Sequence, residues 1–287
     1  MKPTPYQTLV SVQQLQDLSL AGQPAVLIDC SFDLANTDAG HSAYLNAHLP
    51  GAHYLHLDRD LSGPKTDATG RFRGRHPLPD RAGFARRMAD LGLRDGLQVV
   101  AYDAQGGMYA ARLWWLLRWL GHANIAVLDG GVQAWAAAGL GLSDAVPTTS
   151  AGDFQPADSL GPSLTAAELQ ACLGQIRLID ARAPERFRGE VEPLDARAGH
   201  IPGASNRLFK NNLQADGCFK PAAELRAEFA ALLAPHQAAS VVHQCGSGVT
   251  ACHNLLAMEH AGLGGSALYP GSWSEWSADP ARPVAKG

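Results

Sequence analysis

Cys245 lies where the sequence could support nucleophilic chemistry. It follows the apolar run 240–242 and precedes the helix-like segment 251–258. Backbone N–H groups at such a strand-to-helix turn point at one spot, and together with the positive end of the helix dipole they favour an anion there. A thiol in that place should ionise readily and become nucleophilic. We therefore predict that Cys245 is catalytic rather than a buried structural thiol.

The elements that must position this cysteine belong to a repeat. Four short patterns of the first half recur in the same order in the second half. They pair 26–29 with 177–180, 48–52 with 200–204, 99–103 with 241–245, and 128–135 with 269–276. Two copies of one domain are the simplest explanation. We predict domains at residues 1–140 and 163–287, joined by a linker at 141–162 that is rich in Ser, Thr, Gly, Asp and Pro.

Short apolar runs alternate with helix-like stretches in each copy. In the first copy, 25–29, 98–102 and 125–128 are typical of buried strands, and 80–91 and 110–120 are typical of helices. This alternation predicts an α/β fold in which each copy has a parallel β-sheet flanked by helices on both faces. Ligands of such sheets bind beyond the carboxyl ends of the strands. Cys245 lies at such an end, and because its counterpart is Asp103, we predict that only the second copy is catalytic.

Composition limits the class of protein. The chain has 287 residues, of which 46% are hydrophobic, and a formal net charge of −4. The share of hydrophobic residues is sufficient for two packed cores. The negative net charge argues against a broad nucleic-acid-binding face. The basic cluster 71–76 is interpreted as a solvated loop. Neither a secretory signal in residues 1–10 nor a membrane-spanning run is visible.

The five cysteines are widely scattered along the sequence, which indicates neither a disulfide framework nor a zinc site. We expect a monomeric cytoplasmic protein without metal or organic cofactor.

Taken together, these motifs resemble the tandem-domain sulfurtransferases of the rhodanese and mercaptopyruvate sulfurtransferase family. The resemblance covers about residues 9–284, and its carriers are 178–182, 186–190, 199–204 and the loop 245–250. It implies two tandem rhodanese-like domains, an inactive first and a catalytic second. It also implies that a donor's sulfur forms a persulfide on Cys245 and passes to cyanide, a small thiol or a thioredoxin-like protein.

The loop helps to choose the sulfur donor. Members of the family that resemble thiosulfate-specific enzymes carry Arg and Lys after the cysteine, whereas Gly246 and Ser247 add no charge here. A neutral loop suits a donor with one carboxylate, such as 3-mercaptopyruvate, and Cys-Gly-Ser-Gly-Val-Thr is the pattern associated with enzymes of that type. Thiosulfate remains the alternative donor.

The resemblance also suggests roles for two arginines. Arg188 matches the arginine that binds the donor's anionic group, since a planar guanidinium holds a carboxylate bidentately. Arg197 is a candidate for a second donor-binding arginine. Asp180 and Arg182, by contrast, are predicted to form a buried structural pair.

Further roles fall on the loop and on the first copy. Ser247 either contacts the donor and relays a proton, or caps the following helix. Asp60 and His76 resemble an acidic residue and a histidine that could act with this serine, or they simply pack a loop. Backbone N–H groups would hold the outer sulfur of the persulfide, namely those of Gly246, Gly248, Val249 and Thr250.

Two other classes of function use a similar loop. A cysteine phosphatase needs an arginine at the sixth position after the cysteine, and Ala251 stands there. A non-catalytic persulfide carrier would need the same loop as the enzyme, so only turnover separates the two.

Overall fold

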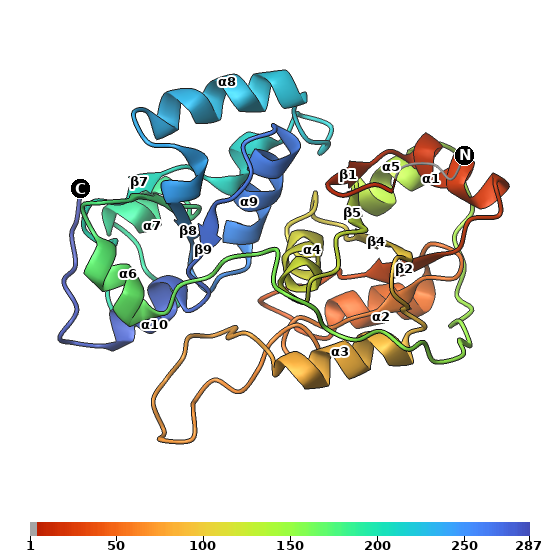
Figure 1. Cartoon of the computed structure of the whole chain (residues 1–287), viewed down its shortest axis with the longest axis horizontal. Coiled ribbons are helices and arrows are strands. Elements are labelled where there is room, and N and C mark those ends of the chain that lie inside the picture. The colour runs from red at the N-terminus through yellow and green to blue at the C-terminus, as the bar shows by residue number, and fades with distance from the viewer. Residues whose placement is uncertain (1–4) are drawn as a thin grey trace. The chain divides into compact units, whose positions relative to one another are not determined.

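The computed structural model describes residues 5–287 (Figure 1). Residues 1–4, which are part of the segment 1–10 considered above for a secretory signal, lie outside the described residues. The chain divides into two compact units. Unit 1 contains the chain up to Leu61, then Pro79–Leu160 and Leu213–Phe219, while unit 2 contains Ser62–Leu78, Gly161–Asn212 and Lys220–Gly287. Each half of the chain therefore contributes one short segment to the unit built mainly from the other half. A division at the linker 141–162 alone does not describe this.

Unit 1 has a five-stranded parallel sheet of order β1-β5-β4-β2-β3. Its strands are β1 (Leu9–Val10), β2 (Ala25–Asp29), β3 (His53–Tyr54), β4 (Gln98–Tyr102) and β5 (Ile125–Leu128). Its helices are α1 (Val12–Leu20), α2 (Ala39–Asn46), α3 (Arg81–Asp90), α4 (Ala110–Trp119) and α5 (Gly131–Ala137). The three predicted strands are confirmed, and the two predicted helices agree to within one residue at either end.

Unit 2 has a four-stranded parallel sheet of order β7-β6-β8-β9. Its strands are β6 (Arg177–Asp180), β7 (Ser205–Asn206), β8 (Val241–Gln244) and β9 (Ala267–Leu268). Its helices are α6 (Ala166–Cys172), α7 (Pro184–Arg188), α8 (Ala222–Leu233), α9 (Thr250–His260) and α10 (Ser272–Ala278), with short 3₁₀ helices η1 (Phe209–Asn212) and η2 (Ala238–Ser240). An isolated parallel bridge between Ser163 and Leu268 stands in the place of β1.

The two sheets confirm the predicted fold class. The strand order β5-β4-β2-β3 of unit 1 corresponds to β9-β8-β6-β7 of unit 2, and helices flank both sheets (Figure 1). The central strands β4 and β8 are buried at every position, which explains their continuous apolar runs. In unit 2 the core includes Trp273 and Trp276, both fully buried. The predicted buried pair is also present, with Arg182 Nη2 2.7 Å from Asp180 Oδ2.

No helix among residues 5–287 combines the length and the hydropathy needed to cross a membrane.

Candidate active site

Cys245 is the first residue after β8 and begins the loop that leads into α9. Its side chain is buried, with 2% of the residue exposed. The first backbone N–H groups of α9 have no partners within the helix, and the helix dipole places partial positive charge at that end. The predicted strand–cysteine–loop–helix arrangement is thus present in unit 2.

The start of α10 holds the cysteine loop in place. The backbone N–H of Cys245 donates to Ser272 Oγ at 3.1 Å, and the Cys245 carbonyl accepts from the Trp273 N–H at 3.0 Å. Ser272 has φ of 54°, and Gly131 makes the same bend in unit 1 with φ of 58°. A glycine is therefore sufficient for the bend. Ser272 adopts a strained backbone conformation at this bend, and its hydroxyl oxygen accepts the hydrogen bond from the Cys245 N–H.

Ser247 and His76 form a hydrogen-bonded pair inside unit 2. Ser247 Oγ and His76 Nδ1 are 2.7 Å apart, and both residues are buried. The two are separated by 171 positions in the sequence. The pairing that the resemblance suggested is therefore present, while its role as a proton relay stays a prediction.

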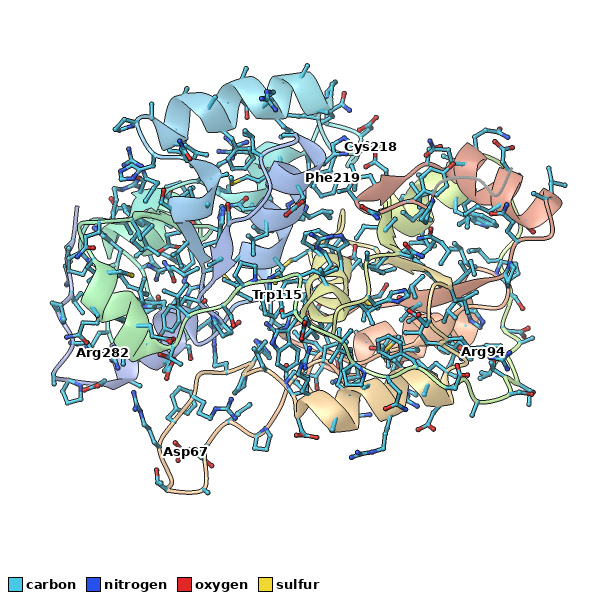
Figure 2. All side chains as sticks on the ribbon, in the orientation of Figure 1. Asp67, Arg94, Trp115, Cys218, Phe219 and Arg282 are labelled. Atoms are coloured by element: carbon cyan, nitrogen blue, oxygen red, sulfur yellow. The ribbon has the colours of Figure 1, made fainter. Side chains whose placement is uncertain are left out.

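A hairpin formed by Ser62–Leu78 brings His76 to the loop. Gly63 N–H donates to the Pro77 carbonyl at the base of the hairpin, and Asp67 lies near its tip (Figure 2). Gly74 packs against α10: its φ is 100°, and a Cβ atom there would lie 2.8 Å from the Gly271 carbonyl oxygen. A glycine is required by both the backbone angle and the close approach.

Asp60 has partners of its own in unit 1. Its Oδ2 accepts from the His56 N–H at 2.8 Å, and its Oδ1 accepts from Arg87 Nε at 3.0 Å. These contacts account for the carboxylate as part of the packing of unit 1. Its predicted part in a relay stays a prediction.

The two arginines predicted to bind the donor are engaged elsewhere. Arg188 has a side chain that is 45% exposed and forms a local pair with Glu190, Nε to Oε1 at 2.7 Å. Arg197 donates to backbone carbonyls at the end of α10 and just beyond it, including those of Ser277 and Asp279. The geometry therefore favours an ion pair for Arg188 and a tethering role for Arg197.

Arg186 and Arg75 are the arginines beside the cysteine loop. A Cβ atom on Gly246 would lie 2.8 Å from Arg75 Nη2 and 3.3 Å from Arg186 Nη1. Arg186 and Arg188 are two residues apart on α7, which is about 200° around a helix, so the two side chains leave on nearly opposite sides. The family motif 186–190 contained Arg186, but the sequence did not show which arginine faces the loop.

The interpretation of 71–76 as a solvated loop is wrong at its end. Arg75 has a side chain only 21% exposed, and its Nε is 3.4 Å from Asp195 Oδ1. Net charge and composition could not reveal this, because the contact joins residues 120 positions apart. The only signal in the sequence was the proximity of Arg75 to His76 in the basic cluster.

Unit 1 supplies an internal test of what this loop binds. Asp103 occupies the position of Cys245, and its carboxylate accepts four backbone N–H groups at 2.7–2.9 Å, from Gln105, Gly107, Tyr109 and Ala110. The same turn in the first copy thus encloses a negatively charged side chain. This supports the view that the turn after Cys245 favours an anion.

Two other cysteines are poor nucleophiles. Burial, together with the carboxylates of Asp129 and Asp216, raises the pKa of Cys218 to about 11. Burial and the neighbouring Asp29 raise the pKa of Cys30 well above its ordinary value. Both thiols stay protonated at neutral pH, which leaves them without the reactive thiolate form.

The fold and the site together define a class: a two-domain α/β protein with one cysteine in the loop between a strand and a helix, at the carboxyl edge of a parallel sheet. The family model for the rhodanese-like domain matches residues 11–138 and 165–279. The chain belongs to the rhodanese family and contains two rhodanese-like domains.

Similar proteins align with nearly the whole chain. It is 48% identical over 282 residues to a probable 3-mercaptopyruvate sulfurtransferase of Pseudomonas aeruginosa, covering 97% of this chain and 98% of the relative. It is 42% identical over 287 residues to a putative thiosulfate sulfurtransferase, SseB, of Mycobacterium tuberculosis, covering 98% of each chain. The solved structure of 3-mercaptopyruvate sulfurtransferase from Leishmania major is similar with a TM-score of 0.81 and 32% identity, covering 97% of this chain and 76% of that one. The chain is an enzyme of the sulfurtransferase class.

Proposed function

We propose that the protein transfers sulfur from 3-mercaptopyruvate through a persulfide on Cys245 to cyanide or a thiol. The observation that carries this proposal is the convergence in unit 2 of a cysteine loop, the Ser247–His76 pair and the guanidinium of Arg186. The thiol is the nucleophile, the hydrogen-bonded pair handles a proton, and the guanidinium binds a carboxylate.

The reaction has two half-reactions. In the first, the Cys245 thiolate attacks the donor's sulfur, the carbon–sulfur bond breaks, and the leaving carbon of pyruvate takes a proton through Ser247 and His76. In the second, the acceptor attacks the outer sulfur of the persulfide and the Cys245 thiolate leaves. Backbone N–H groups of Gly246, Gly248, Val249 and Thr250 surround the outer sulfur in the interval.

The role first assigned to Arg188 passes to Arg186 in this proposal. Arg186 is held by Glu192, Nη2 to Oε1 at 2.7 Å, and its Nη1 lies toward Gly246. A fixed guanidinium with a donor nitrogen near the loop suits a carboxylate of the donor. Arg197 keeps its tethering contacts with the end of α10.

A comparison of donors tests the proposal directly. We expect a higher kcat/KM with 3-mercaptopyruvate than with thiosulfate, with cyanide as acceptor. Arg186→Ala should lower kcat/KM for 3-mercaptopyruvate about 30-fold, which corresponds to roughly 2 kcal/mol for a lost charged hydrogen bond. Arg188→Ala is the matched control and should change it less than about twofold. A strong preference for thiosulfate would overturn the choice of donor.

One observation favours thiosulfate as the second candidate. Arg75 and Arg186 restore positive charge next to a loop that has none of its own, and thiosulfate carries two negative charges. The name of the Mycobacterium tuberculosis relative points the same way. A third reading, a persulfide carrier without turnover, would appear in the same assay as one sulfur transferred per protein molecule.

The setting of the reaction is also part of the proposal. The five cysteines, all within the described residues, are free, which fits a reducing compartment such as the cytoplasm. We propose a monomer that needs no metal or organic cofactor. The physiological acceptor would be a small thiol or a thioredoxin-like protein.

A further inference from the structure

We infer that Arg75 is a second donor-binding residue, and that Asp195 positions Arg75 and Arg186 so that both can bind one carboxylate beside Cys245. The inference rests on the proposed function, because it names how the site would recognise a carboxylate-bearing donor. It assigns the recognition to a hairpin from the first half of the chain.

Two guanidinium groups meet next to the residue that follows the cysteine. From the position that a Cβ atom of Gly246 would occupy, Arg75 Nη2 is 2.8 Å away and Arg186 Nη1 is 3.3 Å away. Any larger side chain at position 246 would displace these nitrogens. Two positive charges therefore lie next to the residue that follows the proposed nucleophile.

Arg75 has few partners for a guanidinium that is mostly buried. Its Nε is buried and lacks a hydrogen-bond partner among residues 5–287, and its ion-pair contact with Asp195 is 3.4 Å long. Burying a charge with incomplete pairing is costly. A carboxylate bound against the exposed part of this guanidinium would supply part of the negative charge that the incomplete pairing with Asp195 lacks.

Arg186 differs because its partners fix it firmly. Glu192 accepts from both Nε and Nη2, and Asp195 Oδ2 accepts from Nη2 at 3.0 Å. This leaves Nη1, the nitrogen nearer to Gly246, for an incoming anion. One arginine is thus held rigidly and the other is held loosely, around the same point.

Asp195 joins the two arginines. Its side chain is 2% exposed, with Oδ1 toward Arg75 and Oδ2 toward Arg186. Its own N–H donates to Glu192 Oε1 at 3.2 Å, which ties it to the group that fixes Arg186. Because one carboxylate contacts both guanidinium groups, it determines how far apart they stand.

Alkylation of Cys245 tests this without assuming a donor. Iodoacetate carries a carboxylate and iodoacetamide does not, so the ratio of their rate constants reports the carboxylate subsite. We expect Arg75→Ala to lower this ratio about tenfold and Arg75→Lys to restore part of it. Arg71→Ala, which removes an exposed arginine from the same hairpin, is the control and should leave the ratio unchanged.

Kinetics then separate the two roles. Arg75→Ala should raise KM for 3-mercaptopyruvate about tenfold with kcat largely kept. Asp195→Asn should lower the alkylation ratio in the same direction, and Asp195→Glu should recover part of it. If the ratio and KM are both unchanged in a folded Arg75→Ala protein, Arg75 is only an ion-pair partner of Asp195 and the inference is wrong.

The inference and the proposed function fail in different ways. An alkylation ratio that falls in Arg75→Ala, in a protein that does not turn over 3-mercaptopyruvate, keeps the carboxylate subsite and rejects the donor. Normal turnover of 3-mercaptopyruvate with an unchanged ratio and KM keeps the donor and rejects Arg75.

Discussion

The lack of a side chain at Gly246 lets the guanidinium groups of Arg75 and Arg186 lie next to the residue that follows Cys245. The loop is neutral in its own sequence, but the guanidinium groups of Arg75 and Arg186 occupy the space that a Cβ atom would need. A loop with Arg at this position could not keep both groups where they are. The absence of a side chain at Gly246 and the position of the two arginines beside it therefore depend on each other.

Gly246→Ala tests this arrangement. The new methyl group would lie 2.8 Å from Arg75 Nη2, so the arginine must move away from the loop. We expect kcat/KM for 3-mercaptopyruvate to fall about tenfold or more, with the free energy of unfolding changed by less than about 1 kcal/mol. An unchanged kcat/KM would mean that the reaction does not require the two arginines to lie beside Gly246.

His243, two residues before the cysteine, makes stability depend on pH. Burial lowers its pKa from 6.5 to about 3, and Arg207 adds to this. The folded state keeps the imidazole neutral while the unfolded state binds a proton below pH 6.5. The unfolded state therefore holds more protons between these values, and stability falls as pH drops through this window.

The expected loss is roughly 2 kcal/mol between about pH 8 and pH 5, measured by urea unfolding. His243→Ala is the matched variant, because Ala101 stands at the corresponding position of β4. The variant should be less stable overall but should lose less stability on acidification. An identical pH dependence in both proteins would assign the acid sensitivity to other groups.

At the scale of elements, the hairpin 62–78 is what completes the site. It carries both Arg75 and His76, and Gly74 is the residue that allows its backbone to lie against Gly271 at the start of α10. The positions of two side chains of the proposed site thus depend on this backbone contact.

Gly74→Ala should displace the hairpin and lower kcat/KM about tenfold, because Ser247 would lose its partner at 2.7 Å. Gly70→Ala is the control: that glycine also has positive φ, 83°, but a Cβ atom there would meet nothing within 4 Å. Equal effects of the two substitutions would attribute the loss to backbone strain rather than to the contact with α10.

The sequence predicted those elements that local patterns determine. The strands β2, β4 and β5 are continuous apolar runs because they are buried, and Cys245 follows such a run. The contact between His76 and Ser247 was suggested by the family resemblance and not by any local pattern, because the two residues lie 171 positions apart. The sequence offered Arg188 as the donor-binding arginine, and it could not show that Arg186 is the arginine of α7 that lies beside Gly246, since only the direction of α7 decides this.

At the scale of the whole molecule, both units contain the same turn after the central strand, β4 or β8, but a different residue occupies it. In unit 1 the carboxylate of Asp103 satisfies four backbone N–H groups, so the turn is filled by the protein itself. In unit 2 the shorter Cys245 side chain stands at the same position. We propose on this basis that unit 1 has a structural role and that unit 2 carries the chemistry.

Asp103→Ala separates these roles. Removing the acceptor of four backbone N–H groups, three of them buried, should lower the free energy of unfolding by on the order of 3 kcal/mol, as measured by urea denaturation. For the protein that remains folded, kcat/KM should stay within about twofold of the original. A large loss of kcat/KM without a loss of stability would place unit 1 in the reaction.

The most direct measurement is the location of transferred sulfur. The protein is incubated with 3-mercaptopyruvate without acceptor, digested without reductant, and analysed by mass spectrometry. We expect the mass of one added sulfur atom on the peptide that contains Cys245, its removal by cyanide, and none on the peptides of Cys30 and Cys218. Sulfur on another cysteine, or on none, would contradict the account.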